Sequence, residues 1–316
     1  MRKVSSLAII LLFALSASVP SVALAQAQEL SDPGALPDDA FYGFKRFFES
    51  VVTAFTFGEE ARANRALELA ELRLAEAKAM VEMGKPQFVE SLARDYEREI
   101  ENAKEIMTSI GDGETKKGVS ERVAVATSRH LEVLDEVREK VPDQAKIAIV
   151  AAKERSMTGN IEALRALAAE DPDRAAEIAM QVAENRALKA REAADRGDSE
   201  MAVEAAGEYM EYERFGQEIS VIAQQVGKDP SRVRELVANA TSIHMIVLQE
   251  VRDKVPDEAR SSIEEAIAAS EEERDWSLEE RNGVPYNSTR QDDDDAAPEE
   301  NDERGPPPSG VASGRP

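Results

Sequence analysis

The residues best suited to chemistry in this chain are its two histidines, His130 and His244. They occupy equivalent places in two copies of one segment, ATSRHLEVLDEVREKVPDQA at 126–145 and ATSIHMIVLQEVRDKVPDEA at 240–259. A symmetric pair of metal ligands is therefore conceivable. However, a threonine stands three positions before each histidine, where a di-iron bundle would have glutamate, and a metal site needs more ligands than one histidine supplies. We interpret both histidines as helix-packing residues that were duplicated together, and we predict no metal site.

Acidic side chains are abundant, but the sequence singles out none as catalytic. Asp and Glu number 63 against 39 Lys and Arg, which gives a net charge of −24. A carboxylate pair that acts as general acid and base needs one member in an apolar environment, and an evenly charged helix surface nominates no such pair. The chain contains no cysteine, and it lacks phosphate-loop, nucleophile-elbow and dinucleotide motifs. We expect a protein that is not an enzyme, with no catalytic residue and no cofactor; a carboxylate-based hydrolase is the remaining enzymatic alternative.

The excess of acid also restricts the partners. Because Lys and Arg must neutralise phosphates, we expect no nucleic acid to bind, and anionic membrane surfaces are disfavoured for the same reason. Many weak oxygen ligands could instead hold divalent cations. A divalent-metal-binding or stress-protective bundle therefore stays open as an alternative function.

The first 25 residues have the pattern of a secretory signal peptide. Arg2 and Lys3 precede an apolar run at 7–17, and Ala23-Leu24-Ala25 matches a cleavage site. No later segment has the roughly 20 apolar residues that a membrane-spanning helix needs. We expect cleavage near Ala25 and a secreted or extracytoplasmic mature chain without a transmembrane segment, beginning with a polar leader at 26–39.

Between the leader and the C-terminal tail, helical periodicity is interrupted only by short Gly- and Pro-containing turns. The predicted fold is all-α: a tandem-duplicated antiparallel helical bundle or set of coiled-coil hairpins. We assign the first repeat unit to residues 40–157 and the second to 158–280, with a helix break between Ser156 and Ile161. Tyr96 and its repeat equivalent Tyr209 are expected at the edge of the core, with their hydroxyls in water.

Aromatic residues concentrate at the start of the first unit. Their spacing of three, four and seven residues places them on one face of a short helix. This face could dock on the chain's own bundle, or it could contact a partner or a membrane surface, because a large apolar face is rarely left bare. The possible partner contacts are Phe41, Phe44, Phe47, Phe48 and Phe55.

This opening region resembles an uncharacterised family of secreted helical domains from archaea and bacteria. The matching residues are LPDDAFYGFKRFFE at 36–49, AFTF at 54–57 and the Ala-, Leu- and Glu-rich helix that follows through Met83. In the family, a Leu-Pro-Asp-x-x-(Phe/Tyr)-Tyr-x-x-Lys-Arg start leads into an aromatic helix, a Phe-Thr-Phe break and a long amphipathic hairpin. The resemblance covers roughly residues 36–110 and the second repeat only loosely. It implies export and a helical fold, and it supplies no catalytic residues.

The last segment, residues 281–316, differs from the rest in composition. It carries the acidic run Asp292–Asp295 and three consecutive prolines at 306–308. Low hydrophobicity and like charges cannot support a core, so we expect a disordered, acidic, Pro-rich tail. Two sequons begin at Asn239 and Asn287, and export would make both possible glycosylation sites.

The sequence therefore predicts an exported, non-enzymatic α-helical protein of the cell envelope or the extracellular space. Its role would be that of a partner-binding or structural module, and its partner a protein or another envelope component. The sequence leaves the oligomeric state open.

Overall fold

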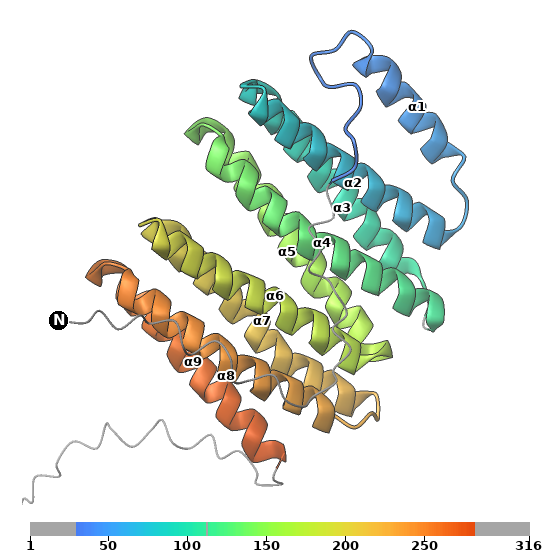
Figure 1. Ribbon diagram of the computed structural model, residues 1–316. Coiled ribbons are helices and arrows are strands. Elements are labelled where there is room, and N and C mark those ends of the chain that lie inside the picture. Colours follow the sequence, from blue (N-terminus) through green and yellow to red (C-terminus); the bar gives the residue numbers. More distant parts are fainter. Residues whose placement is uncertain (1–29, 112, 282–316) are drawn as a thin grey trace, which may run out of the picture. The chain divides into compact units, whose positions relative to one another are not determined.

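The computed structural model describes residues 30–111 and 113–281, and helices joined by short turns make up most of this part of the chain (Figure 1). The predicted all-α repeat architecture is confirmed. The predicted signal peptide, the predicted tail beyond Arg281 and the sequon at Asn287 lie outside the described residues. The helices are α1 (Tyr42–Ala54), α2 (Glu59–Glu82), a short 3-10 helix (Pro86–Phe88), α3 (Val89–Ser109), α4 (Glu114–Lys140), α5 (Asp143–Glu170), α6 (Pro172–Asp195), α7 (Ser199–Gln225), α8 (Ser231–Lys254) and α9 (Asp257–Arg281).

The chain forms two compact units, and the boundary between them along the sequence falls between Ala166 and Leu167. In the first unit, α2 packs against α3 and α4. In the second unit, α6 packs against α7 and α8, and α9 also packs against α7 and α8. The duplicated sequence corresponds to α2–α5 and α6–α9. The division at 166/167 and the predicted one at 157/158 both fall inside α5.

Equivalent turns close the first helix of each repeat. After α2, Gly84 has a φ of +70° and the Lys85 amide donates to the Met80 carbonyl at 2.8 Å. After α6, Gly197 has a φ of +77° and the Asp198 amide donates to the Ala193 carbonyl at 2.9 Å. This pattern is the Schellman motif, in which glycine adopts the left-handed conformation without a Cβ clash. The repeated sequence thus produces the same hairpin twice.

Small side chains line the buried stripe of α2 and α6. Alanine permits close approach of neighbouring helices, and each stripe has an arginine at the same position, Arg73 in α2 and Arg186 in α6. Four buried alanines stand at equivalent positions in both helices: Ala63, Ala66, Ala70 and Ala77 in α2, and Ala176, Ala179, Ala183 and Ala190 in α6.

The predicted helix break between Ser156 and Ile161 is wrong, because α5 is continuous from Asp143 to Glu170. Gly159 lies inside this segment and serves helix packing, because a Cβ at this position would lie 3.1 Å from the Ile100 Cγ2 atom of α3. The neighbouring Asn160 is buried and its amide donates to the Ala124 carbonyl of α4 at 2.6 Å. Gly159 and Asn160, which lie in the predicted break, are therefore helix-contact residues within the long helix α5.

We expect Gly159→Leu to lower the free energy of unfolding by about 1–3 kcal/mol, since the added side chain must displace Ile100 in a packed core. Gly118→Leu in α4 is the matched control, because a Cβ there would meet only the end of the Arg122 side chain, at 3.8 Å. The control should leave stability unchanged or raise it by up to about 1 kcal/mol through helix propensity. Urea unfolding followed by circular dichroism measures both variants, and equal stability of the two would contradict close packing at Gly159.

Candidate functional site

The phenylalanine side chains of α1 point away from the bundle. No residue of this helix is buried, and most of its large apolar side chains are half exposed or more. Phe44 and Phe48 contact each other edge to face, with ring centroids 4.6 Å apart. We call the following set the aromatic face: Phe41, Phe44, Phe47, Phe48, Val52, Phe55 and, just after the helix, Phe57.

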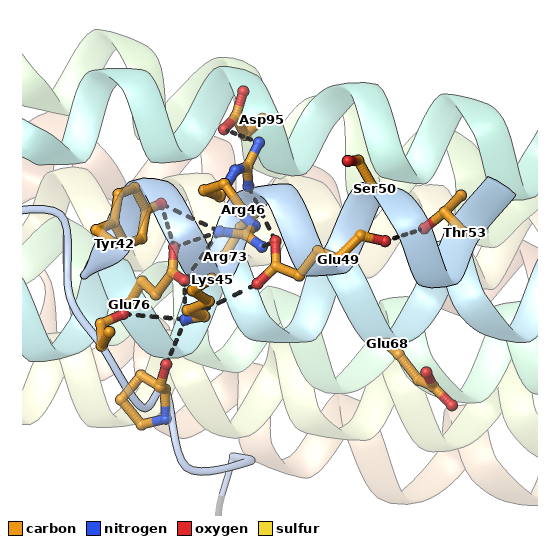
Figure 2. Close-up of polar contacts among 12 residues, drawn as sticks. Tyr42, Lys45, Arg46, Glu49, Ser50, Thr53, Glu68, Arg73, Glu76 and Asp95 are labelled. Atoms are coloured by element: carbon orange, nitrogen blue, oxygen red, sulfur yellow. Dashed lines mark hydrogen bonds and ion pairs between the residues drawn. The ribbon is translucent and has the colours of Figure 1, made fainter.

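The opposite, polar face of α1 lies on α2, where the fully buried Arg73 guanidinium is the central group (Figure 2). Its Nη1 donates to both carboxylate oxygens of Glu76, at 2.9 and 2.7 Å, and to the Tyr42 hydroxyl at 3.1 Å. Its Nη2 pairs with Glu49 of α1. Tyr42 in turn donates to Glu76 Oε2 at 2.9 Å. One arginine of α2 thus binds two residues of α1 directly.

Lys45 joins the same cluster to the segment that precedes α1. Its Nζ donates to Glu76 and to the Pro33 carbonyl, and to the Ala35 carbonyl at 3.1 Å. Before it, Ser31 donates to Glu71 of α2 from both its amide and its hydroxyl. These bonds fix both the helix and its N-terminal approach to α2.

Arg46 reaches past α2 to α3. Its Nη2 lies 2.9 Å from Asp95 Oδ2, and its Nη1 lies 3.6 Å from Glu49. The cations and carboxylates beneath α1 are therefore equal in number, and we call them, together with Tyr42, the charge network. They are Lys45, Arg46 and Arg73 against Glu49, Glu76 and Asp95.

Two groups of the network, Tyr42 and Arg73, have pKa values above their usual ones. Burial, followed by the nearby Glu76 carboxylate, raises the pKa of Tyr42 to about 12, so this hydroxyl remains a donor. Burial alone would lower the pKa of Arg73, but Glu76 and Glu49 outweigh it and raise the pKa above the usual value. Buried charges that are paired and hydrogen-bonded in this way are strongly coupled to one another.

Helix α1 is thus amphipathic with its polar side inward. Of the alternatives that the sequence left open, docking of the aromatic face on the chain's own bundle is wrong for the described residues. The usual preference for apolar burial is reversed because Arg73 and Glu76, on the facing surface of α2, need partners once they are out of water. The five predicted contact residues Phe41, Phe44, Phe47, Phe48 and Phe55 lie together on the exposed side.

The two histidines lie in the cores of their units. His130 and His244 are 2% and 3% exposed, and each packs edge-on against a tyrosine, Tyr96 and Tyr209, at 5.5 Å between ring centroids. The prediction that these tyrosines place their hydroxyls in water is wrong, because both are fully buried. The Tyr96 hydroxyl lies 3.3 Å from His130 Nδ1. Burial lowers the pKa of His130 to about 3 and that of His244 to about 4.

One carboxylate, that of Glu213, is buried deeply enough to shift its pKa. Burial raises the pKa of Glu213 in α7, which accepts hydrogen bonds from the Tyr209 hydroxyl and, at 2.7 Å, from the Ser270 hydroxyl. Both of its oxygens are engaged inside the helix bundle, and the residue is 2% exposed. We interpret this cluster as the polar part of the core of the second unit.

Other predicted features can be located in the described part of the chain. Asn239 lies exposed within α8, while Thr241 of its sequon is buried. Among residues 30–111 and 113–281, no group of three or more metal-ligating side chains gathers in one place. Across the same residues, every helix falls short of the length and apolar character that crossing a membrane requires.

Comparison with known proteins finds one matching domain family, whose function is unknown, and a solved structure with a similar fold. Residues 34–144 match the model of a domain of unknown function, DUF5667. That segment contains α1 and the first three helices of the first repeat. A solved structure described as a circular tandem repeat protein with novel repeat topology and enhanced subunit contact surfaces is similar in fold, with a TM-score of 0.55 and 14% identity. The alignment covers 75% of this chain and 52% of that structure, so the chain spans about half its length. No curated protein matches the chain in sequence.

The charge network was missed at the sequence level, although a signal for it exists. Arg73 continues the alanine stripe of α2, three residues after Ala70 and four before Ala77. A charge at a core position of a helix requires partners from another element. The polar residues Tyr42, Lys45 and Glu49 recur at the same helical spacing as the phenylalanines. They therefore form a polar face that α1 could turn toward Arg73.

Proposed function

We propose that the protein is an exported, non-enzymatic helical module that binds a partner of the cell envelope or the extracellular space through the aromatic face of α1. The observation that supports this proposal is the orientation of the helix. Phe41, Phe44, Phe47 and Phe55 are each 60% exposed or more, while the charged side chains of the helix pair with the bundle or with each other beneath it. Water-facing phenylalanines are costly for a soluble protein, and contiguous apolar patches of this kind mark contact sites.

The charge network supports the same proposal because it holds the face in place. A helix tethered only by a mobile linker could turn its phenylalanines inward. Here the ion pairs of Arg73 with Glu49 and of Arg46 with Asp95 oppose that rotation. A preorganised contact surface loses less conformational entropy on binding than a flexible one.

Thiol labelling in the native setting tests whether the face is covered. The chain has no cysteine, so Ala54→Cys places a single thiol beside the face, seven residues after Phe47, at an exposed position. Ala268→Cys on α9 is the matched control, since it also replaces an exposed helical alanine. On producing cells we expect a membrane-impermeant maleimide to label the Ala54→Cys variant several-fold more slowly than the Ala268→Cys variant. After denaturation the two rates should be equal.

Equal labelling of the two variants on cells would contradict the proposed function, because it would mean that the aromatic face is bare where the protein works. Labelling of both variants only after lysis would contradict export. The two outcomes can be distinguished. Labelling of Ala268→Cys shows whether the protein lies outside the membrane, and the ratio of the two labelling rates shows whether the aromatic face is covered.

A further inference from the structure

We infer that the occupant of the aromatic face is the same face of a second copy of this chain, in a symmetric dimer. This inference rests on the proposed function, since it names the partner of that surface. Three properties of the face carry it: its area, its lack of charge and its single occurrence in the described chain.

The area matches what a stable dimer buries. The six phenylalanines of the face are 49–78% exposed. At about 200 Å² for each aromatic side chain, their exposed parts amount to roughly 800 Å². Each partner of a standard protein interface buries about this area, whereas the largest apolar patch of a typical monomer is about 300–600 Å². The face is therefore larger than a soluble monomer ordinarily leaves in water.

The charges on α1 are directed away from the face. Lys45, Arg46 and Glu49 all pair with residues of the bundle or with each other, so two such faces can meet without placing like charges opposite each other. The same observation disfavours a bilayer as occupant. Helices that lie in a membrane interface carry Lys and Arg free to reach lipid phosphates, and here those side chains are engaged beneath the helix. The net charge of −24 also opposes an anionic leaflet.

The face occurs once among the described residues, because the second repeat begins directly with α6 and has no counterpart of the aromatic helix. One self-complementary patch per chain gives a closed twofold dimer, in which residues of one patch contact the same patch of the partner. A chain with two such patches could instead build assemblies larger than a dimer. The aromatic composition agrees with this reading, since Phe is enriched in the cores of such interfaces.

Sedimentation velocity over a range of protein concentrations tests the dimer. The chain is produced from the full sequence with residues 1–25 included and is purified in the form that the host yields. Its intact mass shows whether those residues are retained. We expect a concentration-dependent rise to twice the monomer mass. Self-association should tighten at high sodium chloride, because salt screens the repulsion between two acidic chains while leaving apolar contacts intact. A partner bound by charge would show the opposite salt dependence.

Phe44→Ser/Phe48→Ser is the diagnostic variant, and Ile243→Ser/Ile246→Ser on α8 is its control. The control side chains are also apolar and are 59% and 60% exposed. The phenylalanine pair should weaken self-association about a thousandfold or more, as expected for loss of central aromatic contacts. The control should dimerise like the parent protein, and both variants should keep the parent's melting behaviour as monomers.

Several outcomes would overturn the dimer while leaving the proposed function intact. The parent protein could remain monomeric at high concentration and high salt while the Ala54→Cys variant is still protected from labelling on cells. It could float with zwitterionic vesicles in a manner that depends on Phe44 and Phe48, which would assign the face to a bilayer. If the intact mass shows that residues 1–25 are retained, the measurement is repeated after their removal, and a chain that is still monomeric then contradicts the dimer. Dissociation of the isoleucine variant instead of the phenylalanine variant would place the interface elsewhere.

Discussion

Replacing Arg73 by methionine should lower the free energy of unfolding by about 3–5 kcal/mol, the usual cost of removing one partner from a buried ion pair. Arg73 is fully buried and contacts Glu49, Glu76 and Tyr42. Methionine fills much of the same volume, so the loss arises chiefly from the two carboxylates that remain in a dry environment with fewer cations. Chemical unfolding by urea, followed by circular dichroism, measures the change.

The control is Arg94→Met on α3. Its guanidinium pairs with Glu90, and both side chains are more than 60% exposed. Surface pairs of this kind contribute about 0–1 kcal/mol, so the control should be close to neutral. If Arg73→Met were equally mild, the charge network would not be what holds α1 on the bundle.

A second substitution separates lost charge from lost packing. Adding Glu76→Met to Arg73→Met removes one of the stranded carboxylates, and buried ion pairs replaced by apolar residues of similar size are often tolerated. The double variant should therefore be more stable than Arg73→Met alone. Hydrogen exchange at the amides of α1 gives a further readout: it should accelerate in Arg73→Met and recover in part in the double variant. A double variant less stable than the single one would indicate a packing role for Glu76.

The orientation of α1 could not be predicted from the sequence pattern alone. The helical spacing of its phenylalanines predicts an amphipathic helix correctly, but periodicity gives two faces and does not say which one is turned inward. That choice depends on what the neighbouring helix presents, and α2 presents Arg73 and Glu76 in place of two apolar side chains. Arg73 and Glu76 need charged or polar partners only because tertiary packing removes them from water. The spacing of residues within α1 gives no information about that packing.

Features that depend on neighbouring residues could be predicted from the sequence, whereas features that depend on residues distant in sequence could not. The turns after α2 and α6 follow from glycine and the residue after it, so they could be predicted. The break predicted between Ser156 and Ile161 was wrong, because Gly159 in this segment packs against Ile100, on a helix far away in sequence. Tyr96 and Tyr209 were misplaced for a similar reason, since their hydroxyls find polar partners in the core that only the folded chain brings near.

Acidification from neutral pH to about pH 5 should destabilise the protein through its two histidines, by about 2 kcal/mol each. Both are buried, and burial lowers the pKa of His130 to about 3 and that of His244 to about 4, from an ordinary value of 6.5. The unfolded chain therefore takes up protons below about pH 6.5 that the folded chain refuses. The stabilisation is complete above that pH and is lost progressively as the pH falls toward the folded-state values, at about 1.4 kcal/mol per pH unit for each histidine.

Urea unfolding of the parent protein and of His130→Gln/His244→Gln at several pH values between neutral and about pH 5 measures this contribution. The chain has only these two histidines, so no other side chain titrates near pH 6.5 in its unfolded state. Glutamine is uncharged at every pH, so the variant loses some stability at neutral pH but should show a much flatter dependence below it. Glu213, whose pKa burial raises, contributes the opposite slope in both proteins and cancels in the comparison. An equally steep loss in the variant would mean that the histidines accept protons without unfolding, which burial against Tyr96 and Tyr209 should prevent.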